Sequence, residues 1–97
     1  MTITVFSRFS GSSRDAFVAV AKKAKPIIEK AGAEMVRMGQ LHTGPHAGDL
    51  LVAIRYPSWE TYGKAQQSLS GNAAYRALYS QVASHLADRI VVDGIDL

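Results

Sequence analysis

The spacing of the apolar residues changes along this chain in a definite order, and that order restricts the fold more than any other feature. Residues 2–9 alternate between two sets of positions and are rich in β-branched and aromatic residues, which is typical of a strand. From Phe17 to Ala31 the apolar residues recur every three or four positions, which indicates a helix with one apolar face. Residues 34–41 and 50–56 have strand patterns again. The first part of the chain therefore predicts the order strand, helix, strand, strand.

The second part of the chain predicts a helical region followed by a last strand. Ser58 is expected to be the N-cap of a helix that begins at Trp59. The Ser-Gly-Asn sequence at 70–72 interrupts this helix and predicts a new N-cap. A further apolar stripe continues to Leu86, and residues 89–95 have the β-branched content of a final strand.

The first helix carries its own boundary signals. Ser12, with Asp15 three residues later, predicts the N-cap. Pro26 lies inside the helical pattern, where the missing N–H predicts a kink. Gly32 is expected to be the C-cap.

The element order predicts an α+β, ferredoxin-like βαββαβ fold, a four-stranded antiparallel sheet with the helices on one face. With 97 residues the chain is too short for two domains, so a single domain is expected over residues 1–97. The uncovered sheet face would present side chains such as Ile3 or Leu51, depending on register. An apolar face of this kind needs a cover. We therefore expect a homodimer in which a second copy packs its own sheet there.

Composition and charge exclude several classes of function. Without cysteine there is no disulfide, thiolate metal site or cysteine nucleophile. The net charge is +3, but the lysines concentrate at residues 22–30 without interleaved aromatic residues, so a solvated helix face is favoured and no nucleic-acid partner is expected. No apolar run approaches the ~20 residues that cross a bilayer, and no signal-peptide pattern is visible. The expectation is a cytoplasmic protein without a membrane partner.

One loop contains residue types that bind metals or act as general bases, namely His42, His46 and Asp49. The Gly-Pro pair between the two histidines prevents the helix that would bring them onto one face. Exposed loop histidines are therefore favoured over a metal site, and no metal is predicted. His42 shares its strand parity with Tyr56, which makes it a candidate for the mouth of a pocket.

Two arginines are a second candidate feature. If Leu41 pairs with Leu51, Arg37 lies directly opposite Arg55, and two adjacent cations repel unless an anion lies between them. An anion clamp is one interpretation. Neutralisation by acidic residues of a partner subunit, or a different register, is the other and is favoured.

A group of aromatic residues is the third candidate feature: Tyr56, Trp59, Tyr62, Tyr75 and Tyr79. Helical spacing makes most of them core residues. Hydroxyl groups that need partners could nevertheless border a cavity for an aromatic or acyl ligand. Gln66, on the same helix face as Trp59, adds a polar group to that wall.

These same residues carry a resemblance to a known superfamily. The passage Tyr-Pro-Ser-Trp-Glu-Thr-Tyr at 56–62, followed by Asn-Ala-Ala-Tyr-Arg-Ala-Leu-Tyr at 72–79, resembles the strand–aromatic–helix signature of the dimeric α/β-barrel superfamily. Its members include antibiotic-biosynthesis-type monooxygenases, haem-degrading monooxygenases, stress-responsive barrel proteins and NIPSNAP-like proteins. The resemblance covers essentially the whole chain and implies paired sheets that form a barrel between two subunits.

The resemblance also implies where chemistry would lie. In the haem-degrading branch an aromatic residue ends the strand and a His late in the second helix ligates iron, whereas this chain has Tyr56 and Tyr79 near those positions. Tyrosine can ligate haem iron, so haem degradation stays a third alternative, although no cofactor is predicted. Cofactor-independent monooxygenases of this fold bind polycyclic phenols with Trp, Tyr, Asn and Arg around an apolar cavity.

Two functional hypotheses remain. In the first, each subunit binds a small aromatic or apolar molecule between sheet and helices and could support cofactor-independent oxygenation. The residues expected to bind that ligand are Tyr56, Trp59, Tyr62 and Tyr79, with His42 at the mouth. In the second, the protein is a non-catalytic ligand-binding or stress-related barrel with the same aromatics as core. No catalytic residue is assigned, and whether the chain is an enzyme stays open.

Overall fold

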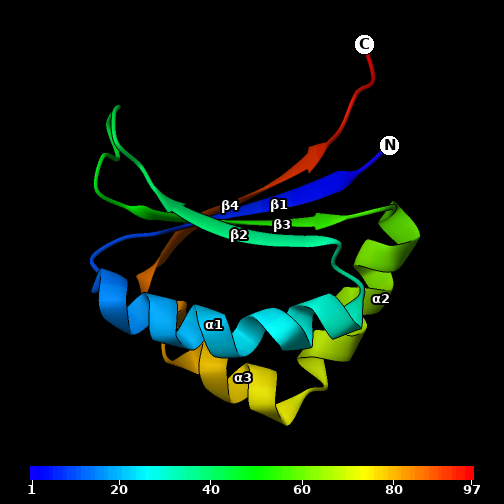
Figure 1. The fold of residues 1–97 in the computed structure, drawn as a ribbon, viewed down its shortest axis with the longest axis horizontal. Coiled ribbons are helices and arrows are strands. Elements are labelled where there is room, and N and C mark those ends of the chain that lie inside the picture. The colour runs from blue at the N-terminus through cyan, green and yellow to red at the C-terminus, as the bar shows by residue number, and fades with distance from the viewer.

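The computed structural model describes residues 1–97 and consists of one sheet and one layer of helices. Its elements are β1 (Ile3–Phe9), α1 (Arg14–Ala31), β2 (Met35–Gln40), β3 (Leu50–Tyr56), α2 (Trp59–Ser70), α3 (Ala73–Ser80), a 3₁₀ turn (Ala83–His85) and β4 (Leu86–Asp93). All three α-helices lie on the same side of the sheet (Figure 1). The predicted ferredoxin-like α+β fold is confirmed.

The four strands form an antiparallel sheet in the order β2-β3-β1-β4, so β1 and β3 are central and β2 and β4 are edges. Val5 lies opposite Ile54 on one side and Val91 on the other, and Val36 lies opposite Ile54. Because side chains alternate between the two faces of a strand, these four residues share the face that the helices cover.

The register of the β2–β3 hairpin differs from the expected one. Leu51 lies opposite Gly39 rather than Leu41, so Arg37 lies opposite Ala53 and not Arg55. The backbone of Leu41 instead exchanges hydrogen bonds with the loop residues that precede β3. Leu41, which the apolar pattern predicted to lie in the strand, therefore belongs to the hairpin loop.

Arg55 also has a partner of its own. Its Nε lies 2.9 Å from Oε1 of Glu34, an acidic residue of the same chain. The expected face-to-face pair of Arg37 and Arg55 is therefore wrong, and with it the anion clamp between them. A different register and an intramolecular carboxylate resolve the repulsion.

The boundaries of α1 follow local hydrogen bonding. The N-cap is Ser13 and not Ser12, because Ser13 Oγ accepts the backbone N–H of Ala16. Helix α1 continues through Pro26 to Ala31 without a break. Gly32 is the C-cap, as predicted, and its N–H donates to carbonyls of the last turn.

The second helical region contains the predicted interruption. Ser58 Oγ accepts the N–H of Thr61 at the start of α2, and Asn72 Oδ1 accepts the N–H of Tyr75 at the start of α3. The last apolar stripe is not helical to its end, since α3 stops at Ser80.

β4 begins before the predicted residue 89. It starts at Leu86, which pairs with Phe9 across an irregularity in the β1–β4 register. Both side chains pack in the same cluster of the core. The pairing with β1 extends the strand beyond its β-branched segment.

The core lies between the sheet and the helices in two clusters. One is centred on Tyr56 and Ala65, which are 1% and 0% exposed, and the other on Phe9 and Phe17. The rings of Phe9 and Phe17 are 4.7 Å apart. Ile3 is fully buried on this side, so the suggestion that it faces outward is wrong.

The opposite face of the sheet carries no helix (Figure 1). We call it the open face; by alternation in the observed register, its apolar side chains are Phe6, Met35, Leu51, Ala53, Ile90 and Val92. Ile90 is 57% exposed. Toward one end of this face Arg8 binds Asp49 and Asp88, with N–O distances of 2.6 and 2.9 Å. The open face therefore combines an exposed apolar area with a small ion-pair network.

We expect the substitution Gly32→Ala to lower the free energy of unfolding by about 1–3 kcal/mol. Gly32 has a φ of +131°, and an added Cβ would lie 2.8 Å from Thr61 Cγ2. Urea denaturation measures the change. The matched control is Gly63→Ala in α2, where nothing lies within 4 Å of the added Cβ and a gain of about 0.5–1 kcal/mol is expected. Equal effects of the two substitutions would contradict the inference that the cap at residue 32 requires glycine.

Candidate functional site

A cavity of about 80 Å³ lies between the sheet and the helices. All four strands contribute to one wall, and α1 and α3 supply most of the other. Its lining is apolar apart from Ser7, Arg89 and the hydroxyl groups of Tyr75 and Tyr79. The cavity therefore offers an apolar space with its polar groups contributed by β1, β4 and α3.

A second cavity of about 60 Å³ adjoins the first on the side of α2. Tyr56, Tyr62 and Gln66 line this second cavity. Four residues line both cavities, namely Ser7, Ile54, Tyr75 and Arg89. These shared side chains form a partition between two neighbouring spaces.

Two hydrogen bonds fix the Arg89 side chain within the partition. Its Nε donates to Ser7 Oγ at 2.9 Å, and one terminal nitrogen donates to Tyr79 Oη at 3.2 Å. The guanidinium carbon also lies 5.8 Å from the centre of the Tyr79 ring, within cation–π range. None of the ion pairs in the structure includes Arg89. A cation without a carboxylate partner thus borders an apolar cavity.

The tyrosines around the cavities form two aromatic pairs. The rings of Tyr56 and Tyr62 meet edge to face at 5.5 Å, and those of Tyr75 and Tyr79 stack at 6.1 Å. Burial raises the pKa of Tyr56 to about 12, with the neighbouring Tyr75 and Tyr62 adding to the shift. Burial likewise raises the pKa of Tyr75. Tyr56 and Tyr75 therefore keep their hydroxyl protons at neutral pH and can donate hydrogen bonds.

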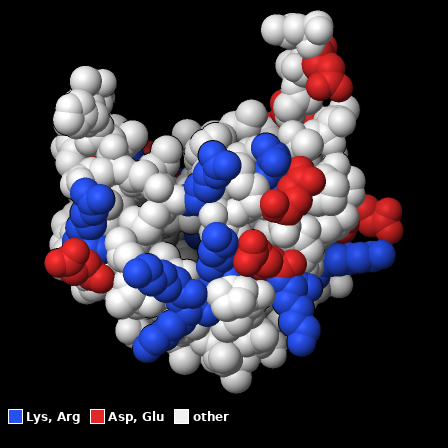
Figure 2. All heavy atoms as spheres, viewed as in Figure 1, with Lys and Arg blue, Asp and Glu red and all other residues white.

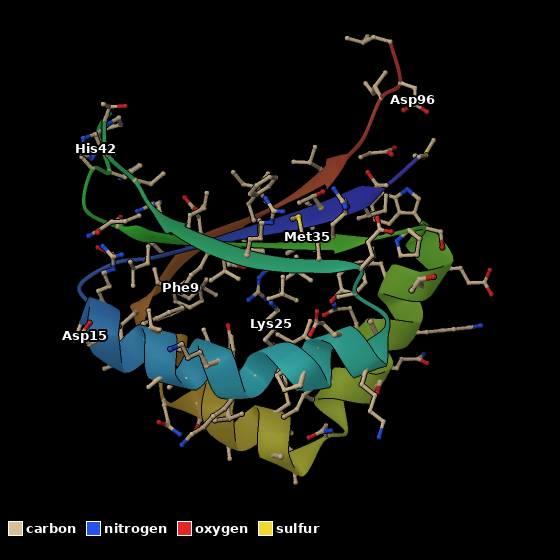
Figure 3. The ribbon with its side chains drawn as sticks, viewed as in Figure 1. Phe9, Asp15, Lys25, Met35, His42 and Asp96 are labelled. Atoms are coloured by element: carbon tan, nitrogen blue, oxygen red, sulfur yellow. The ribbon has the colours of Figure 1, made fainter.

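Three of the five residues expected to bind a ligand line the two cavities, but they do not share one cavity. Tyr56 and Tyr62 line the smaller cavity, and Tyr79 lines the larger one. Trp59 lines neither and is 50% exposed, with its ring 5.8 Å from that of Tyr62. His42 is exposed in the hairpin loop at the end of β3 opposite Tyr56 (Figure 3). His42 lies beyond the end of β2, so its shared strand parity with Tyr56 does not bring the two side chains together.

The sequence pattern does not identify Arg89 and Ser7 as site residues, and it places Tyr75 in the aromatic group but not among the expected ligand-binding residues. A usable signal existed, because Ser7 occupies an inward position in the alternation of β1. A polar residue at such a position needs a hydrogen-bond partner. Arg89 lies opposite Ser7 in the β1–β4 register and supplies it. That pairing becomes visible only when the strand register is known.

The remaining cofactor candidates do not fit the observed side chains. No group of three or more His, Asp or Glu side chains could hold a metal ion. The Asp49 carboxylate hydrogen-bonds to Arg8, which lowers its pKa. Tyr79, the residue considered as a haem-iron ligand, accepts a hydrogen bond from Arg89. A guanidinium at that oxygen would oppose a second cation such as iron.

No helix has the combination of length and hydropathy that a membrane span requires.

Comparison with protein families gives one match. The family model described as "Domain of unknown function (DUF6854)" matches residues 1–94, so the chain belongs to that family. A search of curated proteins finds no significant match.

Comparison with solved structures identifies the wider fold. SnoaB, a cofactor-independent oxygenase from Streptomyces nogalater, has a TM-score of 0.75 at 7% identity, with 99% of this chain and 95% of that chain covered. A NIPSNAP family protein from Agrobacterium tumefaciens gives 0.70 at 10% identity, with 99% and 95% covered. A dimeric ferredoxin-like protein of unknown function from Thermobifida fusca gives 0.63 at 18% identity, with 95% and 88% covered. The chain therefore has the ferredoxin-like fold of these proteins, among them a NIPSNAP family protein as the resemblance predicted.

We expect the free energy of unfolding to decrease as the pH rises from 10 to about 12, because Tyr56 binds its proton more tightly in the folded state. The stabilisation is fully present below pH 10, the unfolded value, and is lost through the folded value of about 12. Denaturant titrations across this range measure the slope. Tyr56→Phe should flatten it, since phenylalanine has no proton to lose. An unchanged slope in Tyr56→Phe would show that other groups cause the pH dependence.

Proposed function

We propose that this member of the DUF6854 family binds a small aromatic or apolar molecule between its sheet and its helices. One observation carries the proposal: the Arg89 guanidinium has no carboxylate partner and borders a cavity whose walls are otherwise almost entirely apolar. Apolar walls with a few convergent polar groups are the usual composition of small-molecule sites. A ligand with an apolar body and one phenolic or carbonyl oxygen matches this composition.

The size of the site sets a condition on binding. The cavities of about 80 and 60 Å³ are each well below the ~300 Å³ at which small-molecule sites begin. A two-ring ligand that occupies these two cavities alone therefore requires the partition between them to move. The long side chains of Tyr75 and Arg89 can change rotamer, and their displacement would merge the two cavities. In the merged site Tyr56 and Gln66 become additional hydrogen-bonding groups.

Cofactor-independent oxygenation of a phenol is the catalytic candidate. An arginine beside a phenolic oxygen favours the phenolate, which is the electron-rich form that reacts with dioxygen. Arg89 occupies such a position at the cavity border. The similarity in fold to SnoaB supports this candidate at the level of the fold alone. A barrel that binds the ligand without transforming it is the alternative, and measurement of oxygen consumption by the complex separates the two.

We further propose a homodimer that forms through the open face. Exposed Ile90 and Val92 lie there beside Phe6 and Leu51. A two-fold partner would bury this apolar area against its own sheet. The dimeric ferredoxin-like neighbour from Thermobifida fusca supports the arrangement by analogy.

We expect naphthol to bind more tightly than naphthalene, because Arg89 can donate a hydrogen bond to the naphthol oxygen. Arg89→Met should weaken naphthol binding roughly tenfold, the effect of losing a charged hydrogen bond of about 1.5 kcal/mol. Naphthalene affinity should not change. Fluorescence titration of the purified protein measures both.

Arg76→Met is the matched control, because Arg76 is exposed on α3 and lies outside both cavities. Its naphthol affinity should equal that of the unaltered protein. The proposal fails if naphthol does not bind, or if Arg89→Met weakens naphthol and naphthalene equally.

We expect Ile90→Asp to convert a dimer into a monomer, since it would place a charge without a partner in the interface. Sedimentation velocity at micromolar concentration measures the mass. Ala19→Asp introduces the same charge at an exposed position of α1, on the helix side, and should leave the dimer intact. A stable monomer in the unaltered protein would contradict the dimer.

A further inference from the structure

A third hollow, which we call the α1–β2 mouth, opens at the edge of the molecule between α1 and the edge strand β2. Its volume is about 230 Å³, larger than that of either cavity described above. Val18 and Ala21 of α1 and Met38 of β2 form part of an apolar floor. Lys22 and Lys25 of α1 also line it. The mouth therefore has an apolar interior and a cationic side.

The mouth adjoins the interior cavity. Ala21, Val36 and Val52 line both the mouth and the cavity of about 80 Å³. Each of these three side chains is only partly buried. Together the two spaces approach the ~300 Å³ at which small-molecule sites begin. The space between sheet and helices is thus bordered by Arg89 at the α3–β4 edge and by lysines at the α1–β2 edge.

The cations at the mouth form no ion pair within the chain. Lys22 and Lys25 are members of no ion pair, and neither is Arg37, which also borders the hollow. Figure 2 shows the mouth as a hollow with Lys and Arg side chains gathered around it. Lys25 lies on the side of α1 that faces the sheet (Figure 3). Two lysines three residues apart on one helix face repel each other, so an anion between them would relieve that repulsion.

We propose that the α1–β2 mouth receives the carboxylate of an amphipathic ligand whose apolar body extends into the cavity. The inference rests on the proposed function and specifies its substrate class, a small aromatic acid. The carboxylate lies between Lys22 and Lys25 in water, where an ion needs little desolvation. The apolar body covers Ala21 and Val52, which lie where the apolar floor of the mouth meets the interior cavity. The oxygen at the other end of the ligand reaches Arg89.

The composition of the mouth favours this ligand over other anions. A free phosphate ion would leave the apolar floor exposed to water and gain nothing from it. A single-stranded nucleic acid typically stacks its bases on aromatic side chains, and the mouth has none. Only a ligand with both an anionic group and an apolar body would contact both the lysines and the apolar floor of the mouth.

The test compares naphthol with a hydroxynaphthoate that carries its hydroxyl and carboxylate on different rings, by isothermal titration calorimetry at low ionic strength. We expect the hydroxynaphthoate to bind roughly tenfold more tightly, an effect of about 1.4 kcal/mol for contact with two exposed cations. The double variant Lys22→Gln/Lys25→Gln should abolish this difference and leave naphthol binding unchanged. Added salt should reduce the difference as well.

The matched control is Lys23→Gln/Lys30→Gln, which removes the same charge from exposed positions of α1 outside the mouth. It should retain most of the preference for the hydroxynaphthoate. Equal affinity for the two probes, or equal losses in the two double variants, overturns the carboxylate site. Failure of naphthol itself to bind is a different result, because it overturns the proposed function of the cavity. Circular dichroism of both variants verifies that each is folded.

Discussion

The structure depends on the register of β1, which pairs with β3 on one side and β4 on the other. Its alternation directs Val5 and Ser7 toward the helices and Phe6 and Arg8 toward the open face. A shift of one residue in β1 would exchange these two sets. Phe6 would then enter the core, and Ser7 would leave the position in which it holds Arg89. The cavity and the open face are therefore two consequences of one pairing.

Features decided by local geometry could be predicted from the sequence. The N-cap at Ser58 and a new N-cap within residues 70–72 are predictable because a side-chain oxygen three residues before a free N–H is a property of a short segment. The fold followed from the order of such segments. The strand end and the helix faces point toward the same layer, where Tyr56 and Tyr62 line the smaller cavity and Tyr79 lines the larger one.

Features that depend on distant residues could not be predicted in the same way. The hairpin register is decided by how many residues its loop takes up, which separated Arg37 from Arg55. The position of His42 depends on the direction of β3, which carries it away from Tyr56. Arg89 became a candidate only through its pairing with Ser7. Cavity volume, finally, is what remains after all side chains have packed, and no sequence pattern encodes it.

The stacking of Tyr75 on Tyr79 has a consequence for the thermodynamics of occupancy. Tyr75 contributes to the partition between the two inner cavities, so a ligand that spans both can bind only to molecules in which this side chain has turned away. The apparent dissociation constant then equals the intrinsic one divided by the fraction of molecules in the opened rotamer. Loosening the stack would raise affinity without adding any contact to the ligand. A protein of this size could thus adjust its binding strength through the rotamer populations of the side chains that separate its cavities.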